Sequence, residues 1–168
     1  MSGLFAPEDE SDAIYFSRRD SDELLGSHVE KSFLLEETLW PSVEHYLQAM
    51  QYESTDEQER VRNLANPEAA YNESKVRWLN MRWLKNRWFN RKRENWTDLR
   101  RVYLTRAVYT QCMTHEEVAN RLLATGDKKL VENDQYDYYW GCGRDRRGTN
   151  MYGQVLMSVR DKLRDQNP

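Results

Sequence analysis

The sequence has little cysteine and histidine, and these shortages exclude several classes of protein. Two cysteines, Cys112 and Cys142, are too few for a scaffold held together by disulfides. With three histidines in the whole chain, no metal-ligand spacing is present, and we expect neither a metal nor a cofactor. The sequence also contains no P-loop and no nucleophile elbow.

Long apolar runs are missing as well. Apolar residues make up 39% of the chain, and no stretch approaches the roughly 20 apolar residues that cross a bilayer. Residues 1–12 are acidic and lack the basic region and apolar core of a secretory signal, so we expect a disordered tail there. The sequence therefore predicts a cytoplasmic protein that does not enter a membrane.

Aromatic and charged residues are abundant instead. Six Trp and ten Tyr can bury enough area to fold a polar chain of 168 residues as one domain, which we place at 13–168. The net charge is −3, but residues 75–93 hold eight Lys or Arg and no acid, which leaves −11 for the rest. This asymmetry concerns partners rather than the fold.

Hydrophobic periodicity and turn residues predict an α+β domain in which helices dominate. We expect strands at 13–16 and near 129–133, and a strand or hairpin arm within 32–40. Helices are predicted to start after Pro41, with Ser42 as cap, and to cover 56–65, 97–112, 115–127 and 151–165, with another starting at Asn66-Pro67. The helix at 97–112 is expected to place five residues on one face: Leu99, Val102, Tyr103, Ala107 and Val108.

Two acids lie where glycoside cleavage could use them, because that chemistry needs an acid or base near the leaving group and a carboxylate that stabilises positive charge. Glu44 lies at a helix start within WPSVEHYLQA, and Asp137 lies within YDYYWGCG. The alternatives are structural. A Glu in a first helical turn often serves the helix dipole, and a loop Asp often caps a turn.

The loop around Trp140 suits recognition of a base. Its indole could stack on a nucleobase, and the neighbouring Gly141 and Gly143 would let backbone N–H groups approach ribose or phosphate oxygens. A Trp that fills the core behind a glycine turn is the alternative. His45 is a candidate substrate contact beside Glu44, with local packing or capping as the alternative, and Cys142 is interpreted as a small loop residue.

A short repeat, RWLNM–RWLKN–RWFNR, occupies 77–91. Interleaved basic and aromatic residues are typical of nucleic-acid binding, which combines phosphate contacts with base stacking. The candidate contacts are Trp78, Arg82, Trp83, Arg87 and Trp88. The alternative is an amphipathic segment whose Trp side chains pack inside while the Arg side chains face water.

Two long motifs resemble the NADAR (YbiA-like) N-glycosidase superfamily. The first, WPSVEHYLQA at 40–49, matches the pattern W-P-x-x-E-H-Y-x-Q-A. The second, at 122–163, follows the order L-L-x-T-x-x-x-x-L-V-E, D-x-x-W-G-x-G and G-x-N-x-x-G-x-x-L-M-x-x-R. The motifs occur in the family's order, so the resemblance implies the YbiA-like α+β fold.

The resemblance also implies a function and a site. It implies hydrolysis of a base–ribose N-glycosidic bond, in a riboflavin-pathway intermediate or in ADP-ribosylated guanine. By resemblance, Glu44, Asp137 and Trp140 fall on active-site positions, and Gly141, Gly143 and Asn150 fall on the substrate loop.

The chain departs from the family pattern at three places. Gln51 occupies the position of a Lys that many members carry, Gln111-Cys112 replaces a Lys-Phe pair, and residues 26–28 stand at the usual Ser-Asn-Phe loop. The alternative hypothesis is therefore a non-catalytic module that binds ADP-ribose, NAD or modified nucleic acid.

Overall fold

The computed structural model describes residues 12–73 and 92–166. The acidic tail predicted at 1–12 lies outside these residues, except for Asp12. Most of the basic segment at 75–93 also lies outside them, and so do all the residues named above as nucleic-acid contacts.

Two strands that are far apart in the sequence pair in parallel. β1 (Ala13–Phe16) lies beside β4 (Lys129–Glu132), with Ala13 opposite Lys129 and Phe16 opposite Glu132. The carboxyl ends of parallel strands meet at one edge, so the segment after Phe16 and the loop after Glu132 begin side by side. Both strands were predicted, but their pairing was not.

The region at 32–40 forms a complete hairpin. β2 (Phe33–Leu35) pairs antiparallel with β3 (Thr38–Trp40) across a two-residue turn. Both turn residues, Glu36 and Glu37, have positive φ angles, 52° and 61°, as the favoured two-residue hairpin turn requires.

Helices fill most of the remaining chain, close to where the sequence predicts them. They are α1 (Val43–Ala49), α2 (Thr55–Arg62), a helix at 67–73, α4 (Trp96–Thr114), α5 (Glu116–Leu123) and α6 (Met151–Gln166). Ser42 caps α1 as expected, because its Oγ accepts from the His45 backbone N–H at 3.2 Å. Gly126 lies past the end of α5 with a φ of 59°, in the left-handed region that glycine adopts freely.

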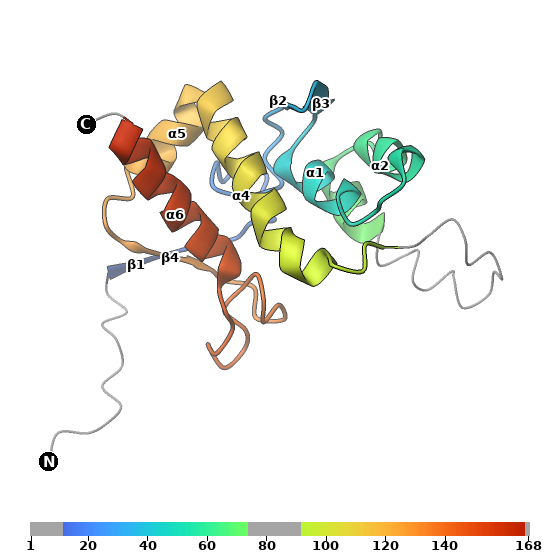
Figure 1. The fold of residues 1–168 in the computed structure, drawn as a ribbon. Coiled ribbons are helices and arrows are strands. Elements are labelled where there is room, and N and C mark those ends of the chain that lie inside the picture. The colour runs from blue at the N-terminus through green and yellow to red at the C-terminus, as the bar shows by residue number, and fades with distance from the viewer. Residues whose placement is uncertain (1–11, 74–91, 167–168) are drawn as a thin grey trace, which may run out of the picture.

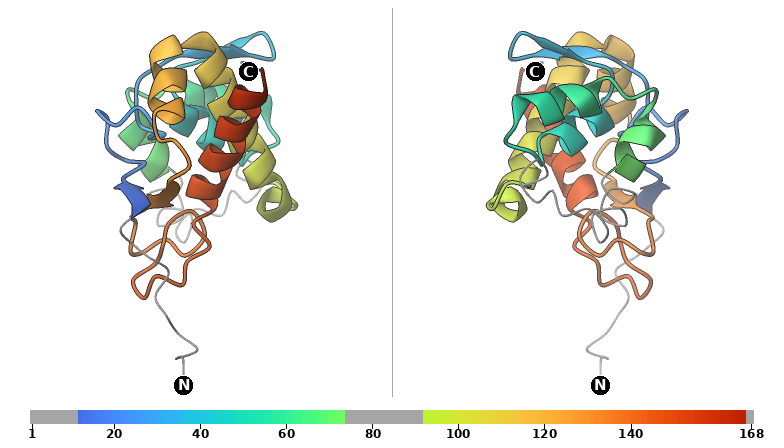
Figure 2. Two further views of the ribbon diagram at one scale, coloured as in Figure 1. Left: turned by 90° about the vertical axis from the view of Figure 1, so that its left-hand side faces the viewer. Right: turned by 90° about the vertical axis from the view of Figure 1, so that its right-hand side faces the viewer.

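α4 is the central helix. It packs against α1 on one side and against α5 and α6 on the other, and it also contacts β2 (Figure 1). α6 covers β4, so the core lies between α4, α6, α1 and the parallel strand pair. The loop between β4 and α6 projects beyond the strands at one end of the molecule (Figure 2).

The predicted buried face of α4 was partly wrong. Val102 is 51% exposed, whereas Leu104, Ala107 and Val108 are buried together with Gln111 and Cys112. At about 100° per residue, Val102 points roughly 200° away from Leu104, and so away from the core. Tyr103 does pack there, stacked on Trp96 with ring centroids 6.0 Å apart.

The fold class predicted from the sequence is confirmed. The described residues form a helix-rich α+β domain with short strands. None of the helices in the described ranges is both long enough and apolar enough to span a membrane.

Candidate functional site

Arg18 lies at the centre of a buried polar cluster at the carboxyl ends of β1 and β4. Its side chain is 2% exposed, and its Nη2 donates to Asp137 Oδ2 at 2.9 Å. Its backbone N–H donates to Glu132 Oε1 at 3.3 Å. The parallel pairing of the two strands explains this meeting, because Arg18 follows Phe16 by two residues and Glu132 ends β4.

Nearby carboxylates more than offset the effect of burial on the pKa of Arg18. Burial alone lowers the pKa of Arg18, but the carboxylates of Glu44, Asp137 and Glu132 outweigh it, so the pKa is raised. Burial raises the pKa of Glu132, and the charge of Arg18 opposes that shift only in part. Arg18 is therefore a permanent cation that pairs with Asp137, in the loop before α6, and interacts electrostatically with Glu44, on α1.

Glu44 is fully buried, and both carboxylate oxygens have partners. Ser27 Oγ donates to Oε2 at 2.6 Å, and Gln48 Nε2 donates to Oε1 at 2.7 Å. Gln51, in the position of the family Lys, donates in turn to Gln48 Oε1. The side-chain amides of Gln48 and Gln51 thus form a hydrogen-bonded chain that leads away from Glu44. Gln51 occupies the position at which the family pattern often has the amine of a Lys.

His28 links Glu44 to a more exposed carboxylate. Its Nδ1 lies 3.8 Å from Glu44 Oε2 and 3.3 Å from Ser27 Oγ, and its Nε2 lies 3.4 Å from Glu68 Oε2. The side chain of His28 is 4% exposed, whereas that of Glu68 is 47% exposed. The Tyr71 ring packs beside His28, with 5.8 Å between ring centroids.

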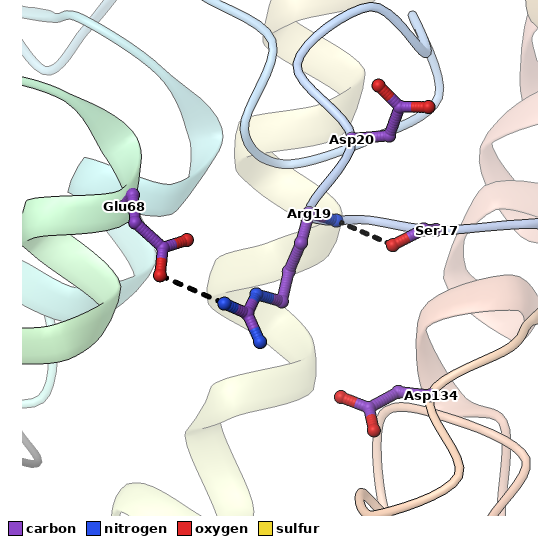
Figure 3. Close-up of a pocket in the computed structure, with 5 residues that line it drawn as sticks. All are labelled: Ser17, Arg19, Asp20, Glu68 and Asp134. Carbon is purple, nitrogen blue, oxygen red and sulfur yellow. Dashed lines mark hydrogen bonds and ion pairs between the residues drawn. The ribbon is translucent and has the colours of Figure 1, made fainter.

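A polar hollow of about 360 Å³ adjoins this cluster, lined by Ser17, Arg19, Asp20, Glu68 and Asp134. Figure 3 shows the Arg19 guanidinium paired with Glu68, with 2.9 Å between Nη2 and Oε1, and Asp134 below Arg19. Arg19 also lies over the Tyr71 ring, 4.6 Å from its centroid. Arg18 and Arg19 are adjacent, so the hollow lies beside the buried cluster.

Asp137 holds the start of the aromatic loop. Its Oδ1 accepts from the backbone N–H groups of Tyr139 and Trp140 at 2.9 and 2.8 Å, while Oδ2 faces Arg18. The side chain is 25% exposed, so one carboxylate both shapes the turn and remains accessible. The geometry of Asp137 therefore agrees both with a turn-capping role and with a catalytic role.

Trp140 lies on the other side of this turn. It is half-buried against the core and meets Tyr139 edge-on, with ring centroids 4.7 Å apart. The Arg100 guanidinium from α4 lies over the Tyr139 ring, 3.1 Å from its centroid, and 5.9 Å from that of Trp140. Stacking of Trp140 on a base stays a prediction.

The substrate-loop residues have clear packing roles. At Gly141, a Cβ would lie 2.5 Å from Glu132 Oε2, so only glycine fits beside that carboxylate. Gly143 has a φ of 70° and lies under the Tyr138 ring. Asn150 Oδ1 accepts from the Glu132 N–H at 2.9 Å, and its Nδ2 donates to the Leu130 carbonyl at 2.8 Å. Gly141 and Asn150 thus both contact Glu132 of the Arg18 cluster.

His45 uses both of its ring nitrogens within the protein. His45 Nδ1 lies 2.8 Å from Ser42 Oγ, and its Nε2 lies 3.2 Å from the Leu64 carbonyl. Burial lowers the pKa of His45 and raises that of the Cys142 thiol. These contacts fit the packing interpretation of His45, and a thiol with a raised pKa is a poor nucleophile.

Sequence reasoning missed four residues of the cluster: Arg18, Ser27, His28 and Glu132. Only one signal could have found Arg18. Arg18 lies two residues after β1, and acidic residues lie at and after the end of β4. A prediction that these two strands pair in parallel would have brought Arg18 and the acidic residues together. The contact between Ser27 and Glu44 spans 17 residues that include the β2–β3 hairpin, and it leaves no periodic signal.

Comparison with known proteins agrees with the fold and the motifs. The sequence model of the NADAR domain matches residues 4–164. An N-glycosidase of Nostoc punctiforme is 32% identical over 136 residues, which are 78% of this chain and 79% of that protein. N-glycosidase YbiA of Escherichia coli is 31% identical over 124 residues, covering 74% of this chain and 71% of YbiA.

A longer relative and a solved structure extend the comparison. A riboflavin biosynthesis protein of Vibrio vulnificus is 31% identical over 158 residues, 92% of this chain, but the match spans only 40% of that protein. The NMR structure of E. coli YbiA superposes with a TM-score of 0.76 at 27% identity, covering 93% of this chain and 88% of YbiA. The chain therefore belongs to the NADAR domain family.

Proposed function

We propose that this protein is an N-glycosidase that hydrolyses the bond between a base and a ribose in a nucleotide-like small molecule. The observation that supports this most is the buried Arg18 cation, which pairs with Asp137, interacts electrostatically with Glu44 and lies beside an open polar hollow. The names of the relatives point the same way, since they include N-glycosidases and riboflavin biosynthesis proteins.

Asp137 is the carboxylate suited to the sugar. Cleavage of an N-glycosidic bond builds positive charge at the anomeric carbon, and a nearby carboxylate stabilises that charge. Asp137 is 25% exposed and is held in place by two backbone N–H groups and by Arg18. Its orientation is therefore fixed before a substrate arrives, and the transition state need not organise it.

Glu44 serves as the acid–base centre in this proposal. Water attack at the anomeric carbon releases a proton, and departure of the base requires one. Glu44 is fully buried and hydrogen-bonded to Ser27 and Gln48, so it can hold its geometry while its protonation changes. The reaction consumes one water, forms a C–O bond to the sugar and breaks the C–N bond to the base.

The polar hollow is the proposed place for the ribose and its substituents. Carboxylates of Asp20, Glu68 and Asp134 can accept hydrogen bonds from sugar hydroxyls or amino groups, and Arg19 can donate to a phosphate. The proposed substrates are a riboflavin-pathway intermediate or ADP-ribosylated guanine.

A binding module is the second candidate function. It is favoured by Gln51, whose amide takes part in the hydrogen-bond chain to Glu44 where many relatives carry a Lys. An amide cannot form a Schiff base with a sugar. A chain that has lost this amine could still bind ADP-ribose, NAD or modified nucleic acid in the hollow.

Incubation with the two substrate classes tests these proposals. The purified protein is mixed with riboflavin-pathway intermediates and with ADP-ribosylated guanosine, and free base is followed by mass spectrometry. Release of free base from either substrate supports the N-glycosidase. Tight binding with the ligand recovered intact supports the binding module instead.

A further inference from the structure

We propose that Ser27, His28 and Glu68 form a proton path between the buried Glu44 carboxylate and the polar hollow. This inference rests on the proposed function of Glu44 as the acid–base centre. Glu44 has no exposed surface, so its carboxylate must exchange protons with solvent through neighbouring groups.

The first step of the path is Ser27. Its hydroxyl donates to Glu44 Oε2 at 2.6 Å, and the same oxygen lies 3.3 Å from His28 Nδ1. When Glu44 gains a proton, its O–H can donate to Ser27 Oγ, and the hydroxyl hydrogen of Ser27 then turns to His28 Nδ1. A serine hydroxyl both donates and accepts, so it can pass a proton without becoming charged overall.

The second step crosses the imidazole ring. His28 Nε2 is buried, makes no hydrogen bond of good geometry, and lies 3.4 Å from Glu68 Oε2. Protonation at Nδ1 makes both ring nitrogens donors, and the Nε2 proton can then move to Glu68. His28 is thereby returned to its neutral form with the proton on the opposite nitrogen, and a ring rotation or a second transfer resets it.

The last step reaches water. Glu68 lines the hollow, and its side chain is 47% exposed. Hydrogen bonds from Asn72 and Arg19 to Oε1 leave Oε2 to face His28. Although partial burial raises the pKa of Glu68, these partners and nearby charges lower it overall, so Glu68 passes a proton on to solvent rather than retaining it.

The surroundings of His28 hold its pKa below the usual value, chiefly through burial. Burial lowers its pKa, the carboxylates of Glu44 and Glu68 oppose this shift, and Arg18 and Arg19 add to it. A neutral imidazole can accept a proton from the Ser27 side and release one on the Glu68 side. Over one turnover, Glu44 takes a proton from the attacking water and gives one to the leaving base, and the path lets the buried carboxylate exchange protons with solvent between these steps.

An NMR titration of the His28 imidazole tests the path without any need for turnover. In Glu44→Gln and in Glu68→Gln, one neighbouring negative charge is lost, so the pKa of His28 should fall below its value in the unmodified protein. A His28 resonance that titrates identically in all three proteins would overturn the proposal, whatever the activity of the chain.

Kinetic measurements then distinguish a role of His28 in proton transfer from a purely structural role. We expect His28→Gln to lower kcat by at least about 10-fold with KM unchanged, since lost acid–base assistance costs that much or more. Added imidazole should restore part of kcat in His28→Ala. His115→Gln, a change at the histidine between α4 and α5, should keep the original rate with and without imidazole.

The possible failures are distinguishable. If the unmodified protein releases base and His28→Gln matches its kcat at every pH, the path is wrong and the proposed function stands. If the unmodified protein releases no base from any substrate, the proposed function fails, and the titration alone decides whether His28 is coupled to Glu44 and Glu68.

Discussion

At the scale of single residues, two adjacent arginines differ sharply in environment. Arg18 is 2% exposed and lies among the carboxylates of Glu44, Glu132 and Asp137, whereas the side chain of Arg19 is 41% exposed. Removing one member of a buried charge cluster leaves the others uncompensated, while an exposed ion pair contributes little. The two positions therefore form a matched pair for experiment.

We predict that Arg18→Gln lowers the free energy of unfolding by about 3–5 kcal/mol, the usual cost of breaking a buried pair. Arg19→Gln should cost less than about 1 kcal/mol, because its pair with Glu68 is exposed. Urea denaturation of both variants measures the difference. Equally small losses would mean that Arg18 does not hold the cluster together.

A pH prediction concerns His28. Because burial lowers its pKa in the folded chain, the unfolded chain binds more protons between that lowered pKa and about 6.5. The free energy of unfolding should therefore fall as pH is lowered through this window, by at most about 1.4 kcal/mol per pH unit from this residue.

The measurement compares thermal melts of the unmodified protein and His28→Gln at pH 7.5 and pH 5.5. The variant should lose less stability on acidification, because it lacks the His28 contribution. The pKa of His45 is also lowered, and the raised pKa of Glu132 acts in the opposite direction. Both residues remain in both proteins, so their contributions drop out of the difference between the two. Equal losses would show that His28 does not carry the effect.

At the scale of elements, Asn150 joins the start of α6 to β4. Its amide bonds to the Glu132 N–H and to the Leu130 carbonyl, and it adopts a φ of 49° that Asn tolerates better than most residues. We predict that Asn150→Ala costs roughly 2–4 kcal/mol, since two buried backbone groups lose their partners. Chemical denaturation should reveal this loss, and an unchanged midpoint would contradict the structural role.

The elements themselves were largely predictable, because capping and periodicity act locally. Ser42 and Gly126 mark helix ends by their own backbone chemistry, and the structure agrees at both. Val102 was placed wrongly because an apolar residue on a long helix does not by itself reveal which side meets the core.

The site was less predictable, because its geometry comes from long-range pairing. The ion pair between Arg18 and Asp137 spans 119 residues, and it depends on β1 lying parallel to β4. No local pattern in the sequence encodes that pairing. Glu44 and Asp137 were nominated on chemical grounds and by resemblance, whereas Arg18 could have been found only by predicting the parallel pairing of β1 and β4.

At the scale of the whole molecule, charge is divided unevenly along the chain. Residues 75–93 hold eight basic residues, and the remainder carries −11. A charge of that size repels phosphates, so the chain is poorly suited to bind nucleic acid in general, although a basic strip can still attract an anionic ligand locally.

We predict that any binding of a short single-stranded oligonucleotide is steeply salt-dependent. Each phosphate contact contributes a slope of about −0.7 in a plot of log affinity against log salt. Fluorescence anisotropy across a salt series measures it, and replacing Arg82 and Arg87 by Gln should reduce the slope by about 1.4. Binding that is indifferent to salt would exclude this segment as the contact.

The central claim concerns the chemistry at Glu44, and one rate comparison tests it most directly. The initial rate of base release is measured for the unmodified protein and for Glu44→Gln, with melting temperatures recorded on the same samples. We predict a loss of about 10²-fold or more in rate with the fold retained, the scale expected when an acid–base group is removed. An unchanged rate in a folded Glu44→Gln variant would contradict the account and leave Glu44 as a purely structural carboxylate.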